Sequence, residues 1–313
     1  MKVKRRMSHS RERDAPNHAE YKASRTAEFM ALFRALESCR SPSTRLFNDP
    51  YAYSFLRPSL KCVVQLARVP LVGAVVPWFI DRRWPGARSS GVARTRLIDD
   101  YLSASIHDGI DQVVILGSGF DCRAYRAVDT AYVRVFEVDH PITLSLKKER
   151  LQRILGALPA SVTYIGMDFN RQSLRRVMRD SGLAFKRRAF FIWEGVTNYL
   201  TEHAVDVVLR YVGSETAPGS RIVFTYVHKG LLDGSAVFEG TRHLWKTLQR
   251  AQEPWLFGIY PDHLHACLAA RGLDLRENLG ASAYRARYMG PSALQMKGYE
   301  FYRVAYAHVR ARC

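Results

Sequence analysis

Cysteine is scarce in this chain of 313 residues, and the few cysteines lie far apart. No two of them form a C-x-x-C pair, and none joins histidines at the spacing of a metal site. The pattern therefore gives neither a disulfide framework nor a zinc centre, and we expect no metal and a reducing, cytoplasmic compartment. The cysteines are Cys39, Cys62, Cys122, Cys267 and Cys313.

Acidic residues are outnumbered, because 29 Asp and Glu face 47 Lys and Arg, for a formal net charge of +18. Part of the excess lies in residues 1–20, which we expect to form a basic, disordered tail. The rest is dispersed over 171–176, 186–188 and the last residues, and no run interleaves basic with aromatic residues. Solvated helix surfaces are favoured over a nucleic-acid groove, so we expect no specific nucleic-acid partner.

Long apolar runs are also missing. The basic start is not followed by an apolar segment, so it is not a secretory signal. The most apolar stretch, residues 62–80, is interrupted by Arg68, Pro70, Gly73 and Pro77. We therefore expect no membrane span there, but a buried helical hairpin or part of a lid.

Two zones follow the tail. Apolar residues recur at helical spacing over 23–39, and further helical stretches run to about residue 105. Beyond residue 110, short β-branched runs alternate with helical patterns, which predicts an α/β fold with a mainly parallel sheet and helices on both faces. We assign 21–105 to an N-terminal helical lid and 106–313 to a Rossmann-like domain. The expected strands are 113–116, 133–138, 162–167, 189–193, 221–227 and 299–308, and the main expected helices after residue 140 are 142–155, 173–180, 203–211 and 262–271.

The stretch V-V-I-L-G-S-G-F-D-C-R, residues 113–123, carries the strongest functional signal. Gly117 and Gly119 follow a predicted strand, where a residue without Cβ lets the backbone turn and approach a ligand. Asp139 comes 20 residues after Gly119, at the tip of the next predicted strand, where a carboxylate accepts hydrogen bonds from ribose hydroxyls. This βαβ pattern predicts a nucleoside-binding site.

The third glycine of a dinucleotide motif is absent. Its place holds Asp121-Cys-Arg, which puts a negative charge where a dinucleotide would bring phosphates. S-adenosylmethionine, which carries adenosine without phosphates, fits better. An NAD(P)-dependent oxidoreductase on the same fold, and a non-catalytic protein that binds adenosine or nucleic acid, stay as alternatives.

Other strand tips add candidate residues. Asp168 and Phe169 suit an adenine, because the carboxylate can accept from the exocyclic amine and the ring can pack on the base. Asp168 is equally suited to be the N-cap of the next helix. Glu194 follows the fourth strand, and an arginine before the first strand, Arg94 or Arg96, can clamp a carboxylate. Among residues near strand ends that could orient or deprotonate an acceptor, Tyr199 and His228 are the catalytic candidates, with Tyr226 beside them.

Taken together, these motifs resemble the leucine carboxyl methyltransferase superfamily, in particular its bacterial branch of S-adenosylmethionine-dependent methyltransferases. The resemblance covers about residues 24–308 and rests on A-R-T-R-L-I-D-D-Y-L, V-V-I-L-G-S-G-F-D-C-R, V-F-E-V-D-H-P, M-D-F and E-G-V-T-N-Y-L. It implies the class I methyltransferase fold, a Rossmann-like sheet of seven strands, with S-adenosyl-L-methionine as cofactor.

By that resemblance, the cofactor-binding positions are Gly117, Asp139, Asp168, Phe169, Glu194 and one of the two arginines. Phe169 stands where the family has leucine, and Cys122 where it has threonine. Thr197-Asn198 replaces a more apolar pair beside the substrate, which leaves the acceptor open. The expected reaction is O-methylation of a carboxylate or a hydroxyl on a small molecule. A carboxylate needs no general base, whereas a hydroxyl does.

Overall fold

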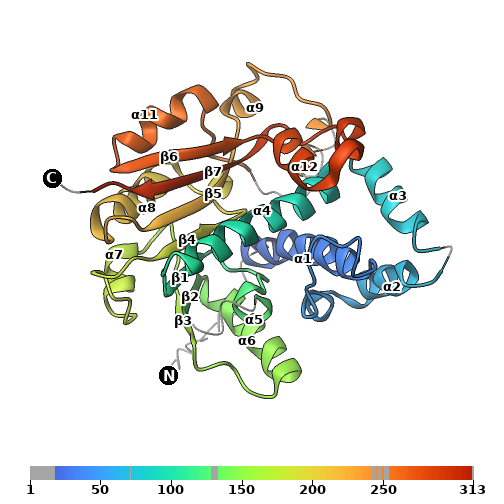
Figure 1. Ribbon diagram of the computed structural model, residues 1–313, viewed down its shortest axis with the longest axis horizontal. Coiled ribbons are helices and arrows are strands. Elements are labelled where there is room, and N and C mark those ends of the chain that lie inside the picture. Colours follow the sequence, from blue (N-terminus) through green and yellow to red (C-terminus); the bar gives the residue numbers. More distant parts are fainter. Residues whose placement is uncertain are drawn as a thin grey trace, which may run out of the picture.

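The protein is described from a computed structural model, which covers residues 18–70, 72–127, 133–241, 244–245, 248–249 and 254–311. Its centre is a twisted sheet with helices packed on both sides (Figure 1). The sheet order is β3-β2-β1-β4-β5-β7-β6. The strands are β1 Gln112–Leu116, β2 Arg134–Asp139, β3 Val162–Gly166, β4 Phe190–Trp193, β5 Arg221–Val227, β6 Leu273–Leu279 and β7 Tyr302–Val309.

Five strands of the sheet, β1 to β5, are parallel, and β7 runs antiparallel to both β5 and β6. The predicted α/β fold with a mainly parallel, seven-stranded sheet is confirmed. From β1 the chain adds β2 and β3 on one side of the sheet, and then β4 and β5 on the other side. The direction of strand order therefore reverses between β1 and β4. In such sheets ligands bind at the carboxyl ends of the strands beside that reversal.

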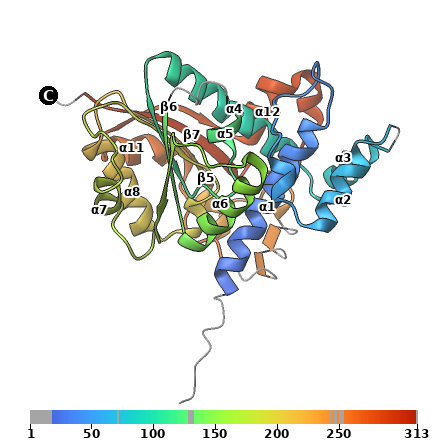
Figure 2. The ribbon, with the colours of Figure 1, turned by 90° about the horizontal axis from the view of Figure 1, so that it is seen from below.

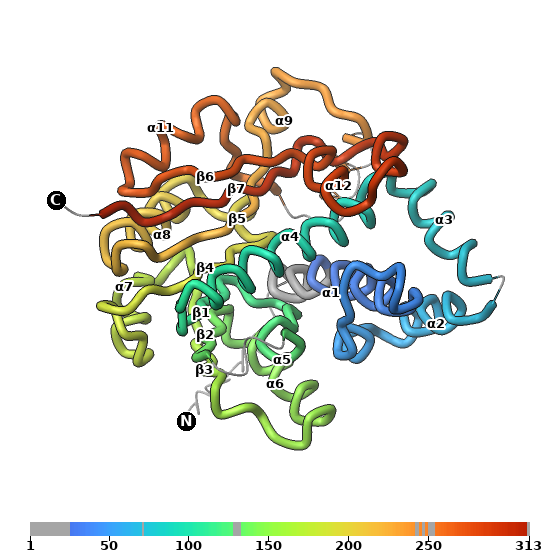
Figure 3. The backbone as a smooth tube through the Cα atoms, viewed as in Figure 1, coloured from blue at the N-terminus to red at the C-terminus, as the bar shows by residue number. Residues whose placement is uncertain are grey.

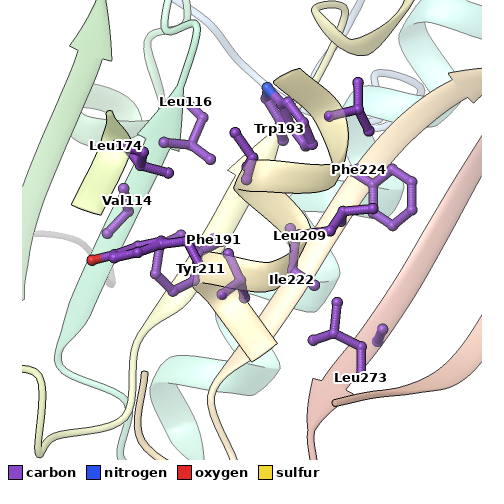
Figure 4. Close-up of a cluster of buried hydrophobic side chains, with 14 of the residues drawn as sticks. Val114, Leu116, Leu174, Phe191, Trp193, Leu209, Tyr211, Ile222, Phe224 and Leu273 are labelled. Atoms are coloured by element: carbon purple, nitrogen blue, oxygen red, sulfur yellow. The ribbon is translucent and has the colours of Figure 1, made fainter. Parts of the chain in front are cut away.

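Both faces of the sheet are covered. On one face, α4 (Ala87–His107) and α12 (Ala281–Met289) pack against side chains of β1, β2, β4 and β5. On the other face lie α7 (Leu174–Arg179), α8 (Glu202–Glu215) and α11 (Leu264–Ala269). Figure 4 shows this second core, with Leu209 and Tyr211 of α8 among side chains of β1, β4 and β5. The double burial explains the unbroken apolar runs of β1, V-V-I-L, and of β4, F-F-I-W.

Side chains cap two of the longer helices. Helix α6 (Pro141–Leu155) is capped by His140, whose Nδ1 accepts from the amide of Ile142 at 3.4 Å. Helix α8 is capped by Thr201, whose hydroxyl accepts from the amide of Ala204 at 3.2 Å. The other elements of this part of the chain are α5 Arg123–Arg126, α6 Pro141–Leu155, η3 Thr197–Tyr199, α9 Lys229–Asp233, η4 Pro261–His263 and η5 Gly290–Gln295.

The N-terminal zone is helical, as predicted, and forms a third apolar cluster beside the sheet. It consists of α1 (His18–Ser38), η1 (Ala52–Phe55), α2 (Pro58–Ala67) and α3 (Val75–Arg83), followed by α4. The tube of Figure 3 shows α1 lying between the sheet and α2. Helix α1 begins at His18, inside the segment predicted as a tail, and residues 1–17 of that prediction lie outside the described residues.

The structure differs from the sequence predictions at four elements. Strand β6 and helix α12 were not predicted, and the segment predicted as a strand from residue 299 pairs only from Tyr302 onward. Residues 62–80 do form helices of a hairpin, but most of its large apolar side chains are exposed. Of the two alternatives, the buried hairpin is therefore wrong, and part of a lid stays a prediction. Over the described ranges, no helix has both the length and the apolar character needed to cross a bilayer.

Candidate functional site

The loop after β1 requires its two glycines. Gly117 has a φ of 65°, and a Cβ at this position would lie 2.2 Å from Cγ2 of Val196. Gly119 has a φ of 42°, and its amide points to the next strand. Between them, the hydroxyl of Ser118 is buried and has no hydrogen-bond partner within the described structure. A tight backbone turn with an unsatisfied polar atom is the arrangement expected where a polar ligand approaches.

Asp139 closes this loop from the tip of β2. Its Oδ2 accepts from the amide of Gly119 at 2.5 Å, and its Oδ1 accepts from the amide of His140 at 2.6 Å. Burial raises the pKa of Asp139, and the two amide donors oppose that rise. The carboxylate thus fixes the glycine loop and keeps lone pairs for further donors.

The tip of β3 lies next to Asp139. The carbonyl of Asp139 accepts from the amide of Met167 at 2.8 Å, which places Asp168 one residue further along the same edge. Oδ1 of Asp168 accepts from the amide of Asn170 at 2.9 Å. Helix α7 has Ser173 as its N-cap, so the alternative role of Asp168 as the cap of that helix is not what the structure shows. Phe169 is half-buried and packs on the core behind this edge.

Glu194, after β4, is held by two arginines from distant parts of the chain. Arg94 of α4 donates through Nε to Oε1 at 2.8 Å, and Arg123 of α5 donates to Oε2 at 3.0 Å. Burial acts to raise the pKa of Glu194, and the two guanidinium groups bring it below its usual range. Arg123 escaped prediction, although its position directly after the glycine loop was the available signal.

These ion pairs belong to a larger buried network. Arg123 also pairs with Asp121 and with Asp99, and the carboxylate of Asp99 is 2.8 Å from Arg126. Burial acts to raise the pKa of Asp121, but Arg123 and other neighbouring cations lower it to about 2. The network contains four arginines and four acids, which are Arg34, Arg94, Arg123, Arg126, Asp49, Asp99, Asp121 and Glu194.

The pairing of Asp121 with Arg123 contradicts the expectation that the charge of Asp121 keeps phosphates away. Asp121 is neutralised by Arg123, so its charge does not by itself repel phosphates from the loop. The exclusion of a dinucleotide therefore rests on the missing third glycine alone.

The two candidate arginines of α4 have different surroundings. Arg94 is buried, contacts Glu194, and lies 4.9 Å above the ring of Tyr302. Arg96 is 43% exposed in its side chain and pairs with Asp100 at 2.8 Å, one turn along the helix. The structure thus brings Arg94, and not Arg96, to the cluster at the carboxyl edge.

A group of tyrosines surrounds Arg94. Tyr302 of β7 has its hydroxyl 3.3 Å from that of Thr225, and burial raises its pKa. Tyr299 is the one residue other than glycine in the described chain with a positive φ, 66°, and burial raises its pKa to about 12. An aromatic residue in the left-handed region is strained, and such strain concentrates at functional sites. Tyr199 is a neighbour of Tyr299, and its hydroxyl lies 3.4 Å from that of Thr26 in α1.

His228 lies apart from Arg94, at the end of β5. Its Nδ1 accepts from the amide of Gly230 at 3.0 Å, so the side chain caps α9. Its ring contacts Phe238 and Tyr260 edge-on, and burial lowers its pKa. Tyr226 points elsewhere: its hydroxyl donates to Asn278 at 2.7 Å, on the strand β6 side of the sheet.

Two overlapping small hollows, each of about 170 Å³, lie beside α8 and α9. Glu202, Lys229 and Gly258 line both, and neither is lined by the residues of the glycine loop. The candidate site is the cluster of Gly117, Asp139, Glu194 and Arg94 at the carboxyl ends of the strands, and it is therefore identified by its residues. Helix α1 packs over this cluster, where Ala27 lies against Gly119.

The sheet order, with β7 antiparallel between β5 and β6, defines the fold class: the Rossmann-like fold of class I methyltransferases. Two solved structures share the fold over most of the chain. A "putative methyltransferase" from Thermobifida fusca aligns with a TM-score of 0.54 and 16% identity over 89% of this chain and 94% of its own. A duf574 family protein from Streptomyces avermitilis also gives 0.54 and 16%, over 88% and 99%.

Sequence comparison is more specific. A model of the leucine carboxyl methyltransferase family matches residues 27–213. A Streptomyces coelicolor protein named "Putative S-adenosyl-L-methionine-dependent methyltransferase" is 31% identical over 74% of this chain and 81% of its own length. A Frankia alni protein with the same description is 30% identical over 75% and 80%. The chain belongs to the leucine carboxyl methyltransferase family, and the predicted resemblance is confirmed.

Membership settles the broad reaction. The protein is a methyltransferase that uses S-adenosyl-L-methionine, and the oxidoreductase and non-catalytic alternatives are not favoured. The buried, unpartnered hydroxyl of Ser118 and the crowded turn at Gly117 fit a cofactor that approaches the backbone closely.

Proposed function

We propose that the protein is an O-methyltransferase that acts in the cytoplasm on a carboxylate or a hydroxyl of a small molecule. The four described cysteines are free thiols, which agrees with a reducing compartment. The observation that carries the choice of reaction is the set of protonated tyrosines around Arg94, at the carboxyl edge of the sheet.

The cofactor end of the site is proposed at the strand tips. Gly117 and Gly119 would provide the cradle, and Asp139 would accept from the ribose hydroxyls. Asp168 and Phe169 would bracket the adenine at the neighbouring tip.

The methionine end is proposed at the buried ion pair. Arg94 would bind the carboxylate of the amino acid, and Glu194 would accept from its ammonium group. Both charges are already paired with each other in the described structure, so neither is left uncompensated before the cofactor arrives.

When bound, the cofactor supplies an activated methyl group on a cationic sulfur. The chain then has to align an acceptor and exclude water. Helix α1 packs over the glycine loop, and the hydroxyl of Tyr199 contacts Thr26 of that helix. The N-terminal helices are therefore placed to cover the site and exclude water. We propose this as the lid function of residues 21–105.

An acceptor that is already an anion suits the tyrosines best. Burial raises the pKa of Tyr299 to about 12 and also raises that of Tyr302, so both stay protonated at neutral pH. They can donate hydrogen bonds to a carboxylate, but they cannot take a proton from a hydroxyl. A carboxylate acceptor needs no base, so it is favoured over a hydroxyl.

A hydroxyl acceptor is supported by a separate observation. Burial lowers the pKa of His228, so its imidazole is neutral at pH 7. Because Nδ1 accepts from the amide of Gly230, the hydrogen of the neutral ring is on Nε2, and the ring can take up a proton only at Nδ1, by releasing that amide. A chain of ring contacts, through Phe238 and Phe301, joins His228 to Tyr299. His228 would serve as the general base, with Tyr199 orienting the acceptor.

The experiment is methyl transfer from labelled cofactor to a metabolite extract, with mass spectrometry of the product. Base-labile product esters would identify a carboxylate acceptor, and stable ethers a hydroxyl. Product labelled on nitrogen, carbon or sulfur would refute O-methylation.

The pH profile of kcat separates the two acceptors. With a carboxylate, the rate should stay level across neutral pH and be unaffected by His228→Asn, because asparagine still caps α9. With a hydroxyl, the rate should fall as the pH drops below the lowered pKa of His228, and His228→Asn should reduce kcat by about 10²-fold or more. A hydroxyl product together with an unaffected variant would rule out His228 as the base.

A further inference from the structure

The α2–α3 hairpin, residues 58–70 and 72–84, carries a concentration of exposed large apolar side chains. They follow the second half of α2, the turn and α3, whereas other exposed apolar residues, such as Val237 and Leu294, occur singly. Exposed apolar residues that gather on one hairpin mark an interaction surface, while isolated residues do not. Its members are Leu66, Val69, Val72, Val75, Trp78, Phe79 and Trp84, with exposed fractions between 36% and 60%.

The same hairpin is basic. Between residues 57 and 84 the sequence has five basic residues and one acid, Asp81, whose carboxylate pairs with Arg88 at 2.5 Å. The surface is therefore both apolar and positively charged. The basic residues are Arg57, Lys61, Arg68, Arg82 and Arg83.

The exposed tryptophans and arginines lie together. The guanidinium of Arg82 is 5.8 Å from the ring centre of Trp78, and that of Arg83 is 5.2 Å from the ring of Trp84. Tryptophan and arginine in this arrangement are typical of the boundary between lipid headgroups and acyl chains. There the ring enters the boundary and the cation stays at the phosphates.

The hairpin stands away from the sheet. In Figures 1 and 2, α1 lies between the sheet and the pair α2 and α3, and the hairpin forms the edge of the molecule. Helix α1 is the element that packs over the glycine loop, since Ala27 lies against Gly119. The hairpin therefore projects on the side where the carboxyl ends of the parallel strands open.

We propose that the α2–α3 hairpin binds the surface of an anionic lipid bilayer, lying in the interface without spanning it. Charge decides between this occupant and a second copy of the chain. Two copies would bring basic hairpins together on proteins that each carry a net charge of +18, whereas an anionic bilayer neutralises them.

The test uses the full chain with unilamellar vesicles of phosphatidylcholine, and of an equal mixture of phosphatidylcholine and phosphatidylglycerol. Co-sedimentation should occur with the mixed vesicles and be weak with phosphatidylcholine alone. Raising the salt from about 0.1 M to about 1 M shortens the Debye length from about 10 Å to about 3 Å, so it should weaken binding.

Variants locate the surface. Trp78→Ser with Phe79→Ser should lower vesicle affinity about tenfold or more, because two exposed rings no longer enter the interface. The matched control is Val237→Ser with Leu294→Ser, which removes two apolar side chains that are 94% and 86% exposed elsewhere, and it should bind as the parent does.

Arg82→Gln with Arg83→Gln should reduce binding to the mixed vesicles, and thermal unfolding should show that every variant is folded. The proposal is overturned if the mixed vesicles are not bound. It is also overturned if the hairpin and control variants bind equally, or if sedimentation velocity shows that the Trp78 and Phe79 changes abolish a dimer and leave vesicle binding intact. None of these outcomes depends on methyl transfer, so they are independent of the proposed reaction.

Discussion

Removal of the Asp139 carboxylate is the most direct test of the cofactor site. In Asp139→Ala, the amides of Gly119 and His140 lose acceptors at 2.5 and 2.6 Å, and the proposed ribose hydroxyls lose theirs. Leaving a buried donor without an acceptor costs about 1–3 kcal/mol. We expect the affinity for S-adenosylmethionine to fall by about 1–3 kcal/mol, which corresponds to about 5- to 150-fold in Kd.

The assay is isothermal titration with S-adenosylmethionine and with S-adenosylhomocysteine, since both carry the same ribose. Asp139→Asn should show a smaller loss, because one oxygen still accepts while the new NH2 group faces a donor. Asp206→Ala is a suitable control, because this carboxylate on α8 pairs with Arg210 and Arg271, away from the glycine loop. A folded Asp139→Ala protein that binds both ligands as tightly as the parent would refute the ribose assignment.

Two further substitutions test the loop and the methionine end. Gly117→Ala should reduce cofactor affinity more than tenfold and lower the midpoint of thermal unfolding, because the new Cβ meets Val196 at 2.2 Å. Gly156→Ala shares a positive φ but meets nothing within 4 Å, so it should cost stability only and leave titration with the cofactor unchanged. Arg94→Lys should weaken cofactor binding about tenfold, since lysine cannot replace the planar guanidinium against a carboxylate. Arg96→Lys should change affinity less than about twofold, because its ion pair is exposed; equal effects at the two arginines would contradict the assignment.

The parts of the fold that the sequence predicted are those set by local pattern. Strand β1 has a continuous apolar run, V-V-I-L, because both faces of the sheet are covered, and the glycines and Asp139 stand at fixed offsets from it along the chain. Strand β6, L-D-L-R-E-N-L, escaped prediction because it is an edge strand, partly exposed and rich in charge.

The parts that could not be predicted depend on contacts between distant residues. Arg94 and Glu194 are 100 residues apart in the chain, and nothing local distinguishes Arg94 from Arg96. The positive φ of Tyr299 is likewise set by the surrounding structure, which is why a strand was expected to begin at that residue. The exposure of Trp78 and Phe79 was missed because an apolar stretch in a globular chain is normally buried.

The proposed adenosine end of the cofactor site is built from backbone turns and from strand tips that are neighbours in the sheet, so it is specified by short motifs. The proposed acceptor end is built from side chains of η3, of β7 and of the segment before β7, namely Tyr199, Tyr299 and Tyr302. Single changes among the tyrosines can alter the acceptor while the loop at Gly117 and Asp139 stays intact. Relatives that share the motifs can therefore share the cofactor and still differ in the molecule they methylate.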